Sequence, residues 1–313
     1  MPGSLIPRTP ARPAGPALCV LASSSSGNCS VLTLPGLSSA LRPSPSFLLL
    51  DMGLGQRRTR AELSRLGLSL DDAAAVILTH LDVDHWNAGW SRWLPARTRI
   101  LAHRRHVEHG VRRGVLPRRA EPLDGAPDLP GGVAAHPALL AHDALGVATL
   151  RFDLPGGGSL GWATDVGRVS PGLVEHLAGV GVLAIESNYC PRMQAASDRP
   201  WWLKQRIMGG SGHLSNEQCA EAVARIAPVR HVVLLHLSRD CNRPEIAARH
   251  HGRAPYALTI ASPEYATPWV PIGVDDEGDS SDYAAETLGA ATAPPAGAPA
   301  TAARAPFAPG PPP

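Results

Sequence analysis

The chain has 313 residues, of which 29 are Lys or Arg and 27 are Asp or Glu, so its formal net charge is only +2. This length suffices for one large domain with a substantial core, and the near-neutral charge says little about partners. No apolar segment reaches the roughly 18 residues of a membrane span, residues 1–16 lack the apolar stretch of a signal peptide, and five Cys without paired spacing indicate a reduced, cytoplasmic protein.

The first predicted elements are short strands and one helix. Apolar runs at 18–22 and 30–34 predict two strands, and the run at 47–50 predicts a third. Residues 55–67 carry Leu at helical spacing and end at Gly, which predicts a helix. Asp51 therefore follows directly on the third strand.

A dense group of metal-binding side chains follows the next predicted strand, the apolar run 73–78. The loop after this strand contains His80, Asp82, Asp84 and His85. Loops at the ends of buried strands are where binding residues concentrate. Imidazole and carboxylate together suit zinc, manganese or iron, and a pair of metal ions needs about this many donors. The sequence therefore predicts a metal-dependent hydrolase with two divalent ions.

Two further patterns follow this loop. Trp86, Trp90 and Trp93 have the spacing of one helical face, which is most often a core stripe, with stacking on a base or sugar as the alternative. Basic residues gather between Arg97 and Arg119, and here we favour a solvated helix face slightly over a nucleic-acid patch.

Four more apolar runs end in possible metal ligands. The donors are His142 after 138–141, Asp165 after 160–164, Glu186 after 182–185 and His236 after 232–235. One such residue at a strand end is usually structural. Several of them in one chain predict a cluster of donors along one edge of a sheet.

The order of the elements predicts the fold class. Strands come first in hairpins and then alternate with helices, one of them at 216–227, which favours an α+β (αββα) sandwich of two packed sheets with helices outside. We expect a disordered tail at 1–16, a hydrolase domain at 17–270 and a disordered Pro- and Ala-rich tail at 271–313.

Seven strings between residues 17 and 250 carry a resemblance to a known family. They are Ser25–Cys29, Leu50–Gly53, His80–His85, Glu186–Tyr189, Trp202–Ile207, Gly212–Asn216 and His236–Ser238. In this order they resemble the metallo-β-lactamase fold superfamily, and within it the branch of YycJ/WalJ-type metallohydrolases. That branch is described as metal-dependent exonucleases acting on double-stranded DNA from a 5′ end. The resemblance implies a metallo-β-lactamase-like four-layer sandwich and a DNA exonuclease.

The resemblance also implies a set of metal ligands. His80, Asp82 and His142 would hold the first ion, Asp84, His85 and His236 the second, and Asp165 would bridge them. One departure concerns Asp82, where the family usually has His. A carboxylate shifts metal preference toward manganese, iron or magnesium over zinc. Three interpretations stay open: an altered choice of metal, occupation of the second site alone, or a non-catalytic protein.

Further roles are implied for residues around the metals. Asp84 and His213 would be the catalytic residues, with His213 as a phosphate contact or as general acid to the leaving oxygen. The substrate-binding residues would be Ser187, Asn188, Lys204 and Arg206. Asp51 would order the metal loops rather than touch metal.

Three functional hypotheses follow. The first is a phosphodiesterase acting on DNA, which the strings around Lys204 and His213 favour. The second is a small-molecule ester, lactone or thioester hydrolase of the same fold, which the Trp-rich stretch 86–93 favours because an apolar pocket suits an acyl group. The third is a degenerate, non-catalytic member that has lost its first metal site.

Overall fold

The computed structural model describes residues 15–34, 47–125, 127–142, 144–252 and 254–273. All of these residues belong to one compact unit, Met1–Asp276, and the second unit, Glu277–Pro313, lies outside them. Most of the two predicted tails also lies outside the described residues. Within the described ranges, no helix is both long and apolar enough to cross a membrane.

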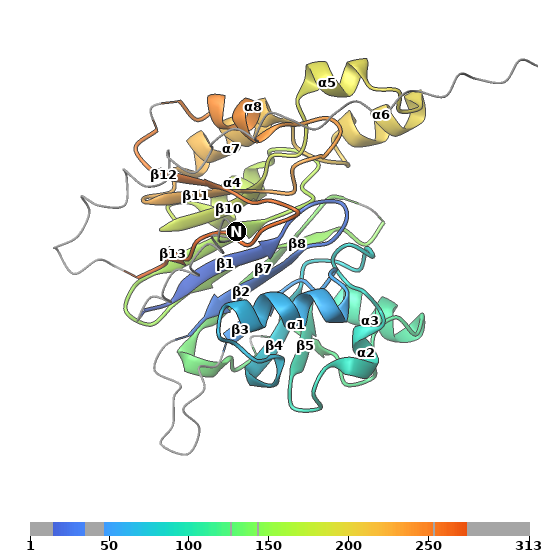
Figure 1. The fold of residues 1–313 in the computed structure, drawn as a ribbon, viewed down its shortest axis with the longest axis vertical. Coiled ribbons are helices and arrows are strands. Elements are labelled where there is room, and N and C mark those ends of the chain that lie inside the picture. The colour runs from blue at the N-terminus through green and yellow to red at the C-terminus, as the bar shows by residue number, and fades with distance from the viewer. Residues whose placement is uncertain (1–14, 35–46, 126, 143, 253, 274–313) are drawn as a thin grey trace, which may run out of the picture. The chain divides into compact units, whose positions relative to one another are not determined.

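Two β-sheets form the centre of the unit (Figure 1). The first has seven strands in the order β13 (Val270–Pro271), β1 (Ala17–Ala22), β2 (Cys29–Thr33), β3 (Phe47–Leu50), β4 (Ala73–Leu78), β5 (Arg99–Ala102) and β6 (Glu121–Pro122). The second has six in the order β12 (Ala257–Ile260), β11 (His231–Leu235), β10 (Val182–Glu186), β9 (Ser159–Ala163), β8 (Val147–Asp153) and β7 (Ala134–Leu140). Strands β3 to β6 are parallel, as are β9 to β12. The remaining neighbours are antiparallel.

Alternate side chains of each strand enter different layers. In β1, Leu18 and Val20 belong to the core between the sheets, whereas Cys19 and Leu21 pack toward the helices outside the first sheet. Strand β10 alternates in the same way between the inter-sheet core and the helices of the second sheet. Successive strand residues point to opposite faces. Because both faces are covered, the strands are continuous apolar runs rather than alternating ones.

Helices cover the outer face of each sheet (Figure 1). The first sheet packs against α1 (Gln56–Arg65), α2 (Trp90–Trp93) and α3 (Arg104–Arg112). The second packs against α4 (Pro171–Leu177), α7 (Asn216–Ile226) and α8 (Pro244–Arg249). Two short 3-10 helices span Leu70–Asp72 and Pro130–Gly132. The layers are therefore α, β, β and α, which confirms the predicted sandwich.

Helices α5 (Pro191–Ala196) and α6 (Trp201–Met208) stand apart from these layers, at the upper right of Figure 1. They follow β10 in the chain and precede α7. A small cluster of its own, Tyr189, Ile207 and Cys241, holds them to the body. This segment forms one wall of the site described below.

The prediction that Trp86, Trp90 and Trp93 share one helical face is wrong. Only α2, of four residues, is helical here, because the segment before it pairs with the end of β3: Trp86 bridges to Met52, and Asn87 N–H donates to Met52 O. Trp86 and Trp90 are buried, and their indole N–H groups donate to backbone carbonyls, whereas Trp93 is 55% exposed. Two of the indoles are core residues of the first sheet, as the more common interpretation expects.

The ordered part of the domain continues past the expected boundary at residue 270. Val270 and Pro271 form β13 and pair with the start of β1. Ile272 is fully buried in the core between the sheets. The composition shift lies farther along the chain than this strand, so it does not reveal β13.

Candidate metal centre

The predicted donors lie at the carboxyl ends of parallel strands in both sheets. Asp51 and His236 directly follow β3 and β11, His80 and Asp165 come two residues after β4 and β9, and Glu186 is the last residue of β10. Three of these, Asp51, Asp165 and His236, have left-handed backbone conformations, with φ of 59°, 56° and 55°. Such angles are uncommon outside glycine and concentrate at functional sites. Here they turn the chain sharply where each strand ends.

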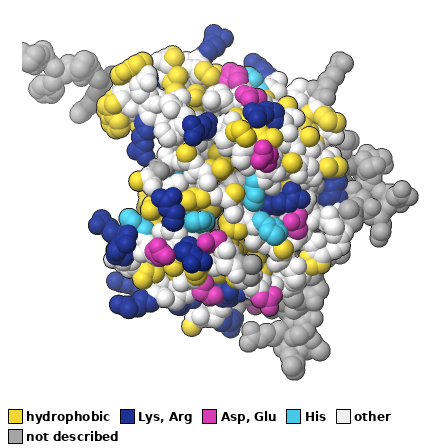
Figure 2. Space-filling view, turned by 180° about the vertical axis from the view of Figure 1, so that it is seen from behind, with side chains coloured by type: hydrophobic (Ala, Val, Ile, Leu, Met, Phe, Trp, Pro, Cys, Tyr) yellow, Lys and Arg dark blue, Asp and Glu magenta, His cyan; other side chains and the backbone are white. Residues whose placement is uncertain are grey.

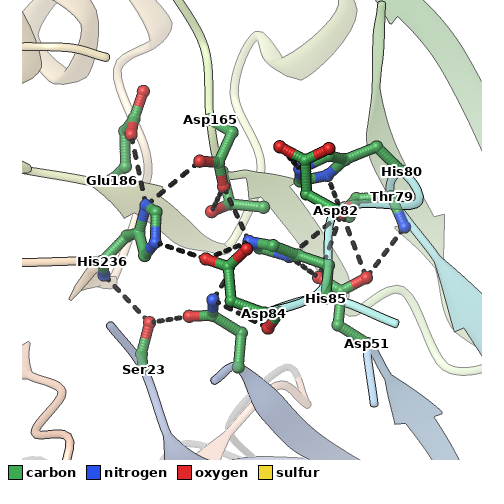
Figure 3. A network of polar contacts seen from close by, with 12 residues as sticks. Ser23, Asp51, Thr79, His80, Asp82, Asp84, His85, Asp165, Glu186 and His236 are labelled. Carbon is green, nitrogen blue, oxygen red and sulfur yellow. Dashed lines mark hydrogen bonds and ion pairs between the residues drawn. The ribbon is translucent and has the colours of Figure 1, made fainter. Parts of the chain in front are cut away.

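The donors form three groups, and within each group the possible ligand atoms lie within 4.8 Å of one another. One group is His80, His142 and Asp165; another is Asp84, His85 and His236; the third is Asp165, Glu186, His213 and His236. The groups share Asp165 and His236, so they form one continuous cluster, much of which Figure 3 shows. The structure thus brings together six of the seven predicted metal ligands.

Asp82, the seventh predicted ligand, stands at the edge of this cluster. Its Oδ2 lies 3.9 Å from His80 Nε2, and its side chain is 48% exposed. Asp82 is outside the three groups found among the described residues. The departure from His at this position therefore falls on the one predicted ligand that is exposed.

The imidazoles are oriented by bonds to their Nδ1 atoms. His85 Nδ1–H donates to Asp51 Oδ2 over 2.8 Å, and His142 Nδ1–H donates to Gly212 O over 3.2 Å. His80 Nδ1 lies 3.0 Å from the Thr79 hydroxyl, which also donates to Asp51. Each bond leaves Nε2 as the nitrogen for a ligand, in the manner of metal-binding His.

A second network joins the loop of residues 80–85, the metal loop, to the polar turn of residues 23–28 (Figure 3). The Ser23 hydroxyl accepts from His236 N–H at 2.9 Å and donates to Asn28 Oδ1 at 2.8 Å. The Asn28 backbone N–H donates to Asp84 O at 2.7 Å, and its side-chain amide lies 3.0 Å from His85 Nε2. Residues from three distant parts of the chain therefore fix one another, which explains why Ser23 and Asn28 of this polar turn are buried.

Glu186 is a buried carboxylate that sequence analysis counted among the strand-end donors but that the family resemblance left without a role. Its Oε1 accepts from the backbone N–H of Val166 at 2.6 Å and of Leu214 at 3.1 Å. Its Oε2 lies 3.1 Å from His213 Nδ1, and Asp165 Oδ1 lies 3.3 Å from the same nitrogen. Glu186 thus fixes His213 against the cluster. The signal was a carboxylate at the end of an apolar strand inside a family-specific string.

Burial and charge set the protonation of the centre without metal. Burial, with His85 nearby, holds the pKa of His80 well below its usual value, so this ring is neutral. Burial also opposes the charged form of His236, but the Asp165 carboxylate and the bonds to Asp84 and Glu186 outweigh it and raise its pKa to about 10. The same balance of burial against Asp165 and Asp51 raises the pKa of His85. The rings of His85 and His236 are therefore protonated when no metal is bound, and a cation would have to displace a proton from each ring.

The residues fit a divalent metal centre. His80 Nε2 is buried and, within the described residues, has no hydrogen-bond partner, which is costly unless a cation or water is bound there. The donor set combines imidazoles with the carboxylates of Asp84 and Asp165, a combination that suits zinc, manganese or iron. The bonds to Nδ1 described above complete the requirements of such a site.

The centre opens into a cleft of about 320 Å³. Its walls comprise metal donors (Asp82, Asp84, His142, Asp165, His236), polar residues (Ser25, Asn188, Gly212, His213, Ser238) and residues of the α5–α6 segment (Arg199, Leu203, Arg206, Ile207). Two arginines therefore line the same space as the donors. A cleft of this composition suits an anionic substrate.

The predicted substrate-binding residues divide into two pairs. Asn188 and Arg206 line the cleft, and the Asn188 amide also donates to His236 O at 2.8 Å. Ser187 is fully buried with its hydroxyl 2.7 Å from Asn216 Oδ1, and the Lys204 ammonium donates to Ala195 O at 2.7 Å, so neither lines the cleft. Strand alternation explains Ser187, because it points away from the face that Glu186 occupies.

Arg199 is a cleft residue that sequence reasoning missed. Its guanidinium bonds to Ser238 Oγ, Asp240 Oδ2 and Gln194 Oε1 and so crosses from α5 to the loop after His236. It lies between two helices in a Pro-containing loop, outside every motif. No signal in the single sequence separates it from the other arginines.

Many members of the predicted basic cluster have local partners. Arg99 pairs with Glu121, Arg104 with Asp124, and Arg97 lies near Asp71. Arg119 donates to the backbone of Thr98. These contacts are those of a solvated helix and its loops, and none of these arginines lines the cleft.

Fold and site together define a metallo-β-lactamase fold hydrolase. The family described as beta-lactamase superfamily domain matches residues 43–237, and the chain belongs to it. The chain is 29% identical over 238 residues to "Exodeoxyribonuclease WalJ" of Streptococcus pneumoniae, covering 73% of this chain and 84% of that protein. It is 27% identical over 207 residues to "Exodeoxyribonuclease YycJ" of Bacillus anthracis, covering 64% and 77%.

Solved structures share the fold at low identity. The metallo-β-lactamase fold protein YhfI of Bacillus subtilis has a TM-score of 0.57 and 14% identity, covering 80% of this chain and 98% of that one. The short form of human tRNase Z has a TM-score of 0.56 and 14% identity, covering 82% and 100%. At this identity the likeness concerns the fold alone.

Proposed function

We propose that the chain is a metal-dependent phosphodiesterase that removes nucleotides from the ends of DNA. The observation that carries this proposal is the joint lining of one cleft by metal donors and by Arg199 and Arg206. The likeness to two proteins named exodeoxyribonucleases supports DNA as the substrate.

Two donor groups support a pair of divalent ions. His80, His142 and Asp165 would hold one and Asp84, His85 and His236 the other. Asp165, whose Oδ2 also lies 3.0 Å from His85 Nε2, would be shared by both. Asp82 would be a further, exposed ligand of the first ion. When bound, such ions generate a hydroxide nucleophile at neutral pH and stabilise charge on the attacked phosphate.

The remaining cleft residues bind and orient the substrate. Arg206 would hold phosphate oxygens, because a planar guanidinium matches a phosphate with two parallel bonds. Arg199, whose Nη atoms already bond to Gln194, Ser238 and Asp240, would add positive charge to the cleft wall. His213 would donate a proton to the leaving oxygen, with Nδ1 held by Glu186 and Nε2 as the nitrogen available to the substrate. Asn188 holds the His236 loop through its amide.

The test uses linear duplex DNA labelled at the 5′ or the 3′ end, with Mn²⁺ added. Wild type should release labelled nucleotides, Asp84→Ala should abolish release, and Asp71→Ala should match wild type because Asp71 is 63% exposed and far from the donors. The labelled end that is lost first gives the polarity. Folded, metal-loaded wild type that leaves DNA intact would contradict the proposal.

The structure removes the observation that favoured a small-molecule hydrolase, the Trp-rich stretch 86–93. Trp86 and Trp90 are buried in the core, so they cannot form an acyl pocket, and Trp93 does not line the cleft.

The location proposed for the protein remains the cytoplasm. Five buried free thiols support a reducing compartment.

A further inference from the structure

Helix α6 exposes two adjacent indoles beside the candidate metal centre. Trp201 is 72% exposed and Trp202 is 66% exposed. Figure 2 shows hydrophobic side chains gathered at the upper left, the end of the molecule where α5 and α6 lie, with Lys or Arg side chains just below them. Large aromatic side chains are usually buried, and a pair left in water next to a cleft indicates a binding surface.

Helical geometry distinguishes the two indoles. Leu203, Arg206 and Ile207 line the cleft, so they define the inner face of α6. At about 100° per residue, Trp202 stands about 40° from Arg206, whereas Trp201 stands about 120–160° from all three residues. Trp202 therefore lies on the Arg206 side of α6, just outside the residues that line the cleft, whereas Trp201 lies on the side away from all three lining residues.

Charge in this segment suits a polyanion. Between residues 189 and 214 the cationic side chains are Arg192, Arg199, Lys204 and Arg206, and Asp198 is the acidic counterpart in the loop between α5 and α6. Arg206 follows Trp202 by four residues and therefore lies one turn along the same side of the helix. An aromatic face with a cation one turn away is the arrangement that binds a base and its phosphate in single strands.

The indole is presented from a well-supported helix. A Cβ on Gly212 would lie 2.4 Å from Arg206 O, so the chain before His213 packs directly on the end of α6. Ile207 is buried with Tyr189 and Cys241 beneath the helix. Pre-organised aromatic groups cost little conformational entropy when they bind.

We propose that Trp202 stacks on an unpaired nucleobase next to the phosphate held in the centre, so that the preferred substrate is a DNA end with single-stranded nucleotides. The proposal rests on the proposed function and deepens it, because it names the part of the substrate that is recognised outside the metal ions. Arg206 binds the phosphate of the stacked nucleotide.

The test measures binding of phosphorothioate-linked duplexes, which resist cleavage, to Mn²⁺-loaded full-length protein by fluorescence anisotropy. One duplex is blunt, one has three unpaired nucleotides, and one has those nucleotides without bases. Trp202→Ala should weaken binding of the unpaired end about tenfold or more. Trp201→Ala should change it less than about twofold, and Trp202→Phe should retain most of it because a phenyl ring still stacks.

Removal of the bases distinguishes stacking from charge. Wild type should bind the end without bases as weakly as Trp202→Ala binds the intact unpaired end. The Trp202→Ala protein should bind these two ends with equal affinity. Two outcomes would overturn this proposal alone, provided that wild type still cleaves DNA. One is that Trp201→Ala and Trp202→Ala weaken binding equally; the other is that wild type binds the end without bases as tightly as the intact unpaired end. A wild type that neither binds nor cleaves DNA would overturn the proposed function with it.

Discussion

The Asp51 carboxylate lies 2.8 Å from His85 Nδ1, and both side chains are fully buried. The other oxygen, Oδ1, accepts from the Thr79 backbone N–H at 2.9 Å. One carboxylate thus links the end of β3, the end of β4 and the metal loop. Its position sets which nitrogen of His85 faces the cluster, so Asp51 acts on the metal through His85.

Asp51→Asn should weaken metal binding without unfolding the protein. The amide oxygen can still accept from Thr79, but the amide nitrogen would face the His85 N–H, donor against donor. Loss of such an outer partner typically lowers metal affinity about 10- to 100-fold. Competition with a chromophoric chelator measures the affinity, and exposed Asp71→Asn is the matched control. Unchanged affinity in folded Asp51→Asn would contradict this role.

Asp82 should affect metal choice more than metal retention. The Asp82 side chain is 48% exposed whereas that of His80 is 2% exposed, so water can replace the carboxylate more readily than the imidazole, and Asp82→Ala should lower metal content less than His80→Ala. Asp82→His should shift preference from manganese toward zinc, by roughly tenfold, because imidazole is the softer ligand. Elemental analysis after equilibration with both ions measures the ratio. An Asp82→Ala protein as depleted as His80→Ala would show that Asp82 is a full ligand.

Glu186 and His213 should act as one unit in catalysis. His213→Ala should lower kcat by about 10²–10⁴-fold if this ring is the general acid. Glu186→Gln keeps an acceptor for the Val166 and Leu214 N–H groups but presents an amide to His213, so kcat should fall and its pH profile should shift. The double variant should be no slower than His213→Ala. Multiplicative losses would instead indicate independent roles.

The sequence predicted which donors would lie together because they follow strands that are easy to recognise. His80, Asp165 and His236 each come just after a continuous apolar run, and parallel strands bring their ends to one edge. The sequence could not place Arg199, which reaches the cleft only through the packing of two helices. Nor could it indicate that Ser187 and Lys204 lie outside the lining of the cleft, since a motif fixes neighbours along the chain but not the direction of each side chain.

Metal binding should release protons and strengthen as pH rises. His236 without metal has its pKa raised to about 10, against burial, by Asp165 and by its bonds to Asp84 and Glu186. Between pH 6.5 and 8.5 the metal-free ring is therefore protonated and must lose this proton to bind a cation. Mn²⁺ affinity should rise about tenfold per pH unit for each proton displaced. Calorimetry in two buffers of different ionisation enthalpy counts the protons, and pH-independent affinity without proton release would refute the expectation.

Gly53 should be indispensable to the metal loop, whereas Gly55 should not. A Cβ on Gly53 would lie 1.7 Å from Asp84 O, and its own N–H donates to Asn28 O at 2.9 Å. Gly53→Ala must therefore push the Asp84 backbone away, at a cost of about 3 kcal/mol of unfolding free energy. It should also lower metal content, because the displaced segment carries Asp84 and His85.

Gly55→Ala is the matched control, since a Cβ there meets nothing within 4 Å and its φ is −69°. Chemical denaturation of both variants, with and without metal, measures the two effects. The gap in stability between the variants should widen when metal is present, because only wild type and Gly55→Ala can gain the full binding free energy. Equal denaturation midpoints for the two variants would show that the Asp84 backbone can move aside freely, and that the close approach of Gly53 does not hold the metal loop in place.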